Sequence, residues 1–133
     1  MVTREEGGTM AGNGNKVVIN LATGLEDAER VTVAFLVGGA AASAGKQVTM
    51  FLTKEAVRLA VGGVAEGVAC EGCPPLPTLV SQYAEAGGHL LVCPICFSAR
   101  KLGEDALVAN AELGGATPLW QWIGDEPATV FSY

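Results

Sequence analysis

Short apolar runs, separated by segments with helical character, constrain the fold of this chain more than any other feature. They occupy residues 16–23, 47–53, 89–93 and 128–133. Runs that are this short and this continuously apolar are typical of strands covered on both faces, as in parallel sheets. Parallel strands need crossover connections, which helices between consecutive strands supply. The sequence therefore predicts an α/β fold.

The segments between these runs predict the helices. Thr23 and Glu26 match the capping-box pattern of a helix start, so a long helix is expected to run from there to about residue 43. Shorter helices, bounded by Gly or Pro, are expected over residues 54–60, 77–86, 97–102 and 117–123. A further strand is expected at the end of residues 106–113. This alternation predicts one domain, residues 16–133, with helices on both faces of a parallel sheet.

Composition narrows the class of protein and its partners. Half of the 133 residues are hydrophobic and 17% are charged, which suits one globular domain with a sizeable core. The net charge is −6, with only eight Lys and Arg residues, so neither nucleic acid nor an anionic membrane is an expected partner. Residues 1–15 are polar and rich in glycine, and we expect them to form a disordered tail.

The apolar segments also bear on the location of the protein. Residues 1–8 contain no apolar stretch of the kind that signal peptides carry. The longest uncharged apolar run, residues 31–45, is interrupted by glycine and is shorter than the roughly 20 residues of a membrane span. We therefore expect a cytoplasmic protein. In that compartment cysteines serve more often in metal binding or redox chemistry than in structural disulfides.

Four cysteines form two pairs of equal spacing. Cys70-x2-Cys73 is followed, after 19 residues, by Cys93-x2-Cys96. By spacing alone, this pattern is typical of a zinc site with four cysteine ligands. In a parallel sheet, the loop that ends at residue 75 and the strand end at Cys93 both reach the carboxyl edge, where open α/β folds bind ligands. The sequence thus predicts that all four thiols converge at this edge.

The second pair has a further property. Cys96 is expected at or just before the start of the helix 97–102, where backbone N–H groups and the helix dipole favour an anion. Arg100 and Lys101 lie one turn away and are candidate thiolate-stabilising residues. A thiolate at Cys96 with Cys93 as its resolving partner suffices for disulfide exchange or persulfide transfer, and the reverse assignment stays open.

Other parts of the chain carry weaker indications. The first expected helix is apolar on nearly all sides, which predicts burial in the core and suggests a subunit interface. His89, the only histidine, opens a strand at the opposite edge and is expected at the surface. The sequence contains neither a phosphate-binding loop nor a recognisable Ser/His/Asp arrangement, so nucleotide binding and hydrolase chemistry are not expected.

Several segments of the chain resemble the DsrE/DsrF-like family of small sulfur-handling proteins. They are residues 22–27, 45–51, 86–96 and 114–118. The Val-Cys-Pro-x-Cys junction within the third segment is the most specific of them. The resemblance implies a three-layer α/β/α fold with a five-stranded, mainly parallel sheet. It also implies homo-oligomers, often trimers or hexamers, and a persulfide on Cys93 or Cys96. The pair Cys70 and Cys73 departs from the family pattern.

Three functions from different classes remain open. The first is a sulfur-relay or thiol-redox protein, with the character of a sulfurtransferase-like carrier, which exchanges sulfur with a donor or acceptor protein and requires no cofactor. The second is a zinc-binding module with Cys70, Cys73, Cys93 and Cys96 as ligands. The third is a non-catalytic oligomeric protein that binds a ligand at the carboxyl edge of the sheet.

Overall fold

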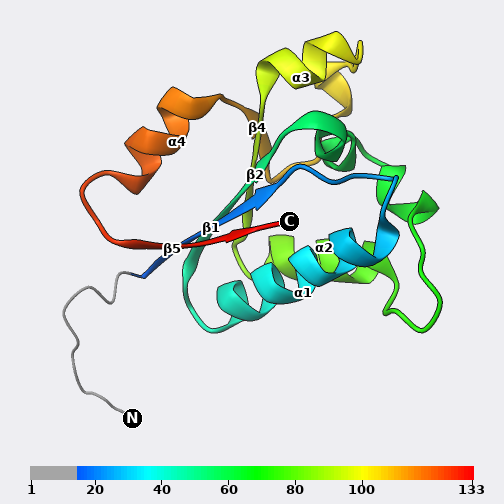
Figure 1. Ribbon diagram of the computed structural model, residues 1–133, viewed down its shortest axis with the longest axis horizontal. Coiled ribbons are helices and arrows are strands. Elements are labelled where there is room, and N and C mark those ends of the chain that lie inside the picture. The colour runs from blue at the N-terminus through cyan, green and yellow to red at the C-terminus, as the bar shows by residue number, and fades with distance from the viewer. Residues whose placement is uncertain (1–14) are drawn as a thin grey trace.

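The computed structural model describes residues 15–133, in which strands and helices alternate as the apolar runs predict (Figure 1). The strands are β1 (Lys16–Leu21), β2 (Gln47–Leu52), β3 (His89–Val92), β4 (Ala111–Leu113) and β5 (Ala128–Ser132). Every neighbouring pair is parallel, in the order β4-β3-β2-β1-β5. The predicted five-stranded parallel α/β fold is confirmed. The tail predicted over residues 1–15 lies, except for Asn15, outside the described residues.

The helices occupy the expected positions between the strands. They are α1 (Ala28–Ser43), α2 (Leu76–Glu85), α3 (Pro94–Ala99) and α4 (Ala116–Ile123). Three short 3-10 helices join them: η1 (Lys54–Ala60), η2 (Val64–Gly67) and η3 (Glu104–Ala106). Figure 1 shows α1 and α2 together on one side of the sheet, α4 on the other side, and α3 beyond the end of β3.

The start of α1 differs from the predicted one. The Asp27 carboxylate accepts a hydrogen bond from the Arg30 backbone N–H at 3.1 Å, so Asp27 is the N-cap residue rather than Thr23. The Glu26 carboxylate instead accepts from the Gly24 backbone N–H at 2.8 Å. Residues 22–27 therefore connect β1 to α1. The apolar run predicts a strand that extends to residue 23, and the capping pattern predicts a helix that begins there, so the observed strand ends earlier and the helix begins later.

The main core lies between the sheet and the two helices α1 and α2. Ile19 and Met50 are register partners in β1 and β2, and both are fully buried. A Cβ atom on Gly38 of α1 would lie 3.0 Å from Ile19 Cδ1 and 3.2 Å from Met50 Cε, so this glycine lets the helix approach the sheet closely. Phe35 of α1 meets Tyr83 of α2 edge-on, with ring centroids 5.7 Å apart.

Tyr83 also fixes α2 to the start of β3. Its ring is fully buried, and its hydroxyl donates to the His89 carbonyl oxygen at 2.7 Å. Burial raises the pKa of the Tyr83 phenol above its usual range, so the hydroxyl stays protonated and remains a donor. The His89 ring, which we expected at the surface, is instead half-buried, with its Nε2 atom 2.7 Å from Glu112 Oε1.

The 16-residue helix α1 buries one side only. Val31 and Phe35 face the core, whereas Val33 and Leu36 are exposed on the other side. The sequence predicts burial of this apolar helix on nearly all sides, whereas the single chain buries only the side that faces the core.

Within residues 15–133, no helix is long and apolar enough to cross a membrane.

Candidate functional site

Cys93 lies where β3 ends and α3 begins. Its backbone N–H donates to the Leu52 carbonyl oxygen of β2 at 3.0 Å, which extends the sheet pairing one residue beyond β3. Its carbonyl oxygen accepts from the Phe97 N–H at 3.0 Å, so the same residue is the N-cap of α3. Pro94 takes the first helical position, where a missing N–H costs no helical hydrogen bond. The predicted strand-to-helix junction is present, but the helix begins at Pro94 rather than at Phe97.

This earlier start changes the place of Cys96. It lies inside the first turn of α3 rather than ahead of the helix. Cys93 and Cys96 are both free thiols, half-buried at the margin of the hydrophobic core. Ile95, between them, is 81% exposed. The dithiol thus combines partial solvent access with a neighbouring exposed apolar side chain.

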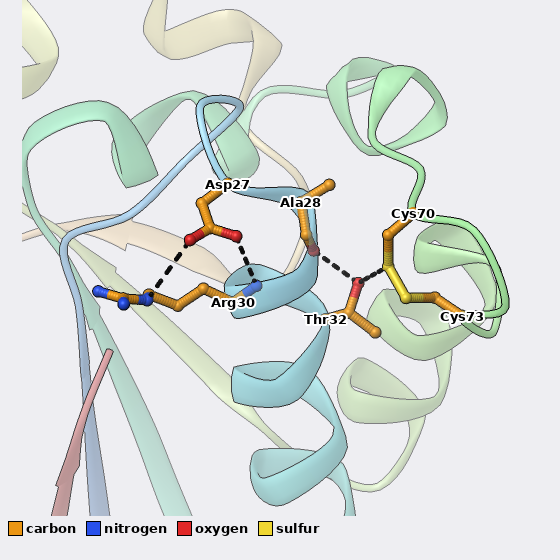
Figure 2. Close-up of a disulfide and its surroundings, with 6 residues drawn as sticks. All are labelled: Asp27, Ala28, Arg30, Thr32, Cys70 and Cys73. Atoms are coloured by element: carbon orange, nitrogen blue, oxygen red, sulfur yellow. Dashed lines mark hydrogen bonds and ion pairs between the residues drawn. A yellow bond between two sulfur atoms is a disulfide. The ribbon is translucent and has the colours of Figure 1, made fainter.

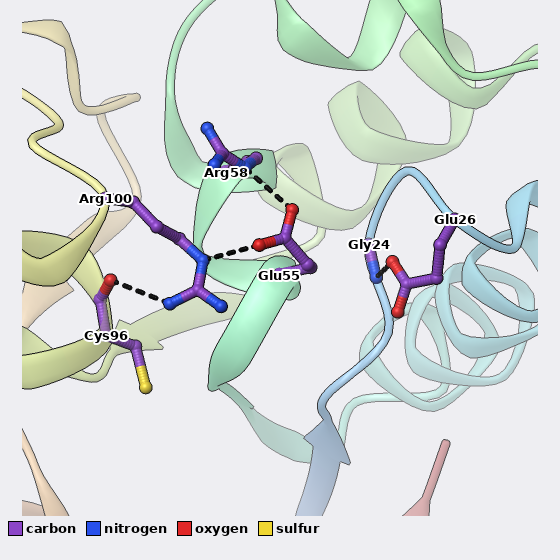
Figure 3. Close-up of polar contacts among 6 residues, drawn as sticks. All are labelled: Gly24, Glu26, Glu55, Arg58, Cys96 and Arg100. Carbon is purple, nitrogen blue, oxygen red and sulfur yellow. Dashed lines mark hydrogen bonds and ion pairs between the residues drawn. The ribbon is translucent and has the colours of Figure 1, made fainter.

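A three-residue ionic network holds α3 against η1 (Figure 3). Arg100 Nε donates to Glu55 Oε2 at 2.7 Å, and Arg58 Nε donates to Glu55 Oε1 at 2.8 Å. Arg100 also donates through Nη1 to the Cys96 carbonyl oxygen at 3.2 Å. The hydrogen bonds of this guanidinium therefore go to Glu55 and to the Cys96 backbone rather than to a sulfur atom. Arg100 fixes the helix that carries the thiol.

Lys101, the other predicted thiolate-stabilising residue, ends α3. Its backbone is left-handed, with φ 56°, and its N–H donates to the Ser98 carbonyl oxygen at 2.9 Å. The Leu102 N–H donates to the Phe97 carbonyl oxygen at 3.3 Å, which completes a Schellman motif. Among residues 15–133, no hydrogen bond or ion pair joins the Lys101 ammonium to Cys96. The contacts of Lys101 are those of a helix terminator.

The Glu55 network predicts a pH dependence of stability. Hydrogen bonds from Arg100 and then Arg58 hold the pKa of Glu55 below its ordinary value of 4.5. A carboxylate with a lowered folded-state pKa stabilises the protein above its unfolded pKa, and the contribution disappears as pH falls through the folded pKa. We expect Glu55→Gln to be less stable than the wild type at neutral pH and to approach it in acid.

Urea unfolding of the wild type and Glu55→Gln, at neutral pH and at about pH 3, measures this difference. A stability difference that stays constant on acidification would show that the ionised Glu55 carboxylate does not stabilise the fold. Glu66→Gln is a matched control because Glu66 is exposed in η2, away from this network, and its loss is expected to leave stability unchanged at both pH values.

The first cysteine pair lies in the loop between η2 and α2 (Figure 2). Cys70 and Cys73 form a disulfide, with Cα atoms 5.4 Å apart. Cys70 Sγ is 3.6 Å from Thr32 Oγ1, in the second turn of α1. Because α1 follows β1, this contact places the loop toward the carboxyl end of the sheet, as predicted, but against α1.

The four cysteines do not converge into the predicted zinc site. In the part of the chain that the structure describes, no group of three or more His, Cys, Asp or Glu side chains is arranged to hold a metal ion. The physical reason is that different elements hold the two pairs, since the first lies against α1 and the second joins β3 to α3. Figure 1 shows the 70–73 loop, in green, well apart from α3.

Two residues around the cysteines were not predicted as part of either site. Glu55 pairs with Arg100 across 45 positions of sequence, and Thr32 meets Cys70 across 38. No local pattern links residues so far apart, because the folded positions of η1, α3 and α1 create both contacts.

A five-stranded parallel sheet with a free dithiol at the end of β3 defines a small α/β thiol protein. The chain belongs to the DsrE/DsrF-like family, whose model matches residues 15–131. The resemblance to this family that the sequence segments indicate is thereby confirmed. No curated protein sequence matches the chain.

Solved structures share the fold at low sequence identity. The YchN protein of E. coli matches with a TM-score of 0.69 and 15% identity, over 89% of this chain and 99% of that one. A protein of unknown function from Methanobacterium thermoautotrophicum matches with a TM-score of 0.65 and 12% identity, over 89% of this chain and 98% of that one. A conserved protein of unknown function from Bacteroides thetaiotaomicron matches with a TM-score of 0.62 and 14% identity, over 94% of this chain and 100% of that one. These likenesses extend over the whole domain and show a common fold.

Proposed function

We propose that the protein is a sulfur-relay or thiol-redox protein that carries a persulfide or a disulfide on Cys93-x2-Cys96. The observation that carries the proposal is the position of two free, half-buried thiols around the first turn of α3, at the carboxyl end of β3. Membership of the DsrE/DsrF-like family supports it, since the family is associated with sulfur handling. The network around Glu55 supports it as well, because it holds α3 and its thiol in a fixed position.

The sulfur-transfer step needs no resident cofactor. The Cys96 thiolate attacks the outer sulfur of a donor persulfide, the S–S bond of the donor breaks, and the donor leaves as a thiolate. Attack by an acceptor thiolate on the outer sulfur then removes it and restores the Cys96 thiolate. Without an acceptor, the Cys93 thiolate attacks the inner sulfur, which releases hydrosulfide and leaves a Cys93–Cys96 disulfide.

We assign the carrier role to Cys96 and the resolving role to Cys93. Cys96 lies in the first turn of α3, where backbone N–H groups without helical acceptors favour a negative charge. Cys93 is the N-cap of the same helix, three positions earlier, and is the neighbouring free thiol.

Sulfur loading of the reduced protein tests the proposal. We expect incubation with a low-molecular-weight persulfide to leave one of two products on the peptide that contains Cys93 and Cys96. These are the mass of one added sulfur atom or, where Cys93 has already displaced that sulfur as hydrosulfide, the Cys93–Cys96 disulfide. The variant Cys70→Ser/Cys73→Ser is the appropriate starting protein because it removes the other reactive pair. A 93–96 peptide that neither gains sulfur nor forms the disulfide with release of hydrosulfide would refute the relay.

We propose that the chain works as a homo-oligomer, a trimer or a hexamer, and that it exchanges sulfur with a donor or acceptor protein. Support comes from large apolar side chains that the single chain leaves exposed, namely Leu25, Val33, Leu36, Ile95, Trp120, Val130 and Phe131. A reducing compartment such as the cytoplasm would keep Cys93 and Cys96 as thiols between turnovers.

A further inference from the structure

We propose that Cys70-x2-Cys73 is a second thiol–disulfide exchange site, which reacts with small-molecule thiols and disulfides through Cys73. The proposed relay at the start of α3 does not use this pair, and the two pairs lie against different helices. The inference therefore stands independently of the function proposed for Cys93 and Cys96.

The loop sequence itself brings the two sulfur atoms together. Residues 70–73 form a turn in which the Cys73 N–H donates to the Cys70 carbonyl oxygen at 3.1 Å. Gly72 has φ 79°, which is the backbone conformation of the third residue in a type II turn. A Cβ atom at Gly72 would meet nothing within 4 Å, so the backbone angle alone calls for glycine here. This turn holds the cysteine Cα atoms 5.4 Å apart, within the range of about 4.4–6.8 Å that a disulfide requires.

The position of the pair suits exchange better than structural cross-linking. A disulfide that closes a four-residue loop constrains the unfolded chain less than one that joins distant elements. Cys70 and Cys73 are both half-buried, and Glu71 and Gly72 between them are exposed. The bond therefore joins no separate elements of the fold, and solvent reaches the turn that carries it.

The surroundings of the two sulfur atoms differ. Cys70 Sγ lies 3.6 Å from Thr32 Oγ1, and Thr32 is only 3% exposed. Figure 2 shows the Cys70 sulfur next to the Thr32 hydroxyl, with the Cys73 sulfur on the side away from it. An attacking thiolate therefore reaches Cys73, and Cys70 is the leaving group. The Thr32 hydroxyl now donates to the Ala28 carbonyl oxygen at 2.8 Å, and by rotation it would donate to the Cys70 thiolate.

Two successive thiolate attacks reduce the Cys70–Cys73 disulfide. A small-molecule thiolate attacks Cys73 Sγ, the bond to Cys70 breaks, and its electron pair leaves on Cys70 as a thiolate. A second small-molecule thiolate then attacks the outer sulfur of the mixed disulfide, which releases a small-molecule disulfide and the Cys73 thiolate. In the reverse direction a small-molecule disulfide is the two-electron oxidant, and Cys73 forms the first bond to it.

Redox titration of full-length Cys93→Ser/Cys96→Ser tests the site, since only the first pair then reacts. We expect glutathione mixtures of increasing oxidised fraction to convert the pair reversibly from dithiol to disulfide, as measured by alkylation and mass spectrometry. In the further variant Cys70→Ser, oxidised glutathione is expected to form a mixed disulfide on Cys73. A pair that stays in one state across all mixtures would overturn the proposal, as would failure to trap glutathione on Cys73.

Thr32 provides a separate test of the direction of attack. We expect Thr32→Val to slow reduction of the Cys70–Cys73 disulfide by dithiothreitol about fivefold to tenfold, because the leaving thiolate loses a hydrogen-bond donor. Thr32→Ser keeps the hydroxyl and is expected to react at nearly the wild-type rate. Equal rates for wild type and Thr32→Val would overturn the assignment of Cys70 as leaving group. Sulfur loading at Cys96 is expected to be unchanged in both variants, which separates this inference from the relay.

Discussion

Gly24→Ala is expected to lower the free energy of unfolding by about 3 kcal/mol, although Gly24 lies in a connection rather than in the core. A Cβ atom there would lie 2.4 Å from the Glu55 carbonyl oxygen and 2.7 Å from the Glu55 carbonyl carbon. Both are backbone atoms, so no change of rotamer relieves the contact. Relief requires a shift of the β1–α1 connection or of η1, and η1 carries the carboxylate that holds Arg100.

Gly39→Ala is the matched control for this substitution. Gly39 lies inside α1, and a Cβ atom there would meet nothing within 4 Å. Because alanine is the better helix former, we expect Gly39→Ala to raise the free energy of unfolding by about 0.5–1 kcal/mol. Urea unfolding of both variants measures the two opposite effects. If Gly24→Ala proved as stable as the wild type, η1 would not contact the β1–α1 connection as described.

The sheet was the part of the fold that could be predicted best. β1 and β2 are six-residue strands that are mostly apolar and mostly buried, and burial on both faces makes such runs conspicuous in the sequence. β4, in contrast, has three residues, Ala111 to Leu113, with Glu112 exposed at its centre. A strand so short and so polar at the sheet edge resembles a loop in composition, so only its approximate position could be predicted.

Helix starts were predicted less well because two local patterns competed. Thr23 with Glu26 and Asp27 with Arg30 both offer capping interactions, and the sequence does not say which is used. The contact of Gly24 with the Glu55 backbone fixes the preceding connection, which leaves Asp27 as the N-cap. A tertiary contact thus decided between two local signals of similar strength.

The candidate site shows the same division between local and long-range information. The junction of β3 with α3 is encoded within a few residues, so the position of Cys93 could be predicted closely. Whether Cys70 would meet Cys93 depended on where the 70–73 loop packs, and that is set by its contact with Thr32 of α1. The partner of Arg100 was unpredictable for the same reason, since Glu55 reaches it only through the packing of η1 on α3.

The largest functional effect is expected from Cys96→Ser. If Cys96 carries the transferred sulfur, its replacement removes the nucleophile, and persulfide loading is expected to fall by about 100-fold or more. Cys93→Ser is expected to load sulfur at nearly the wild-type rate, because the resolving thiol acts only after the persulfide forms. Hydrosulfide release without an acceptor is expected to disappear in both variants. The serine is nearly isosteric and both sites are half-buried, so neither change is expected to unfold the protein.

The two variants together decide which thiol carries sulfur. Mass spectrometry of the intact protein measures total loading, mass spectrometry of the 93–96 peptide locates it, and a hydrosulfide assay measures the resolving step. Retention of loading in Cys96→Ser with its loss in Cys93→Ser would reverse the assignment, because the N-cap thiol would then be the carrier. Normal loading in both single variants, and in the double variant, would place the sulfur elsewhere and contradict the relay at α3. Cys70→Ser/Cys73→Ser serves as the control, because removal of the pair beside α1 leaves the proposed carrier intact.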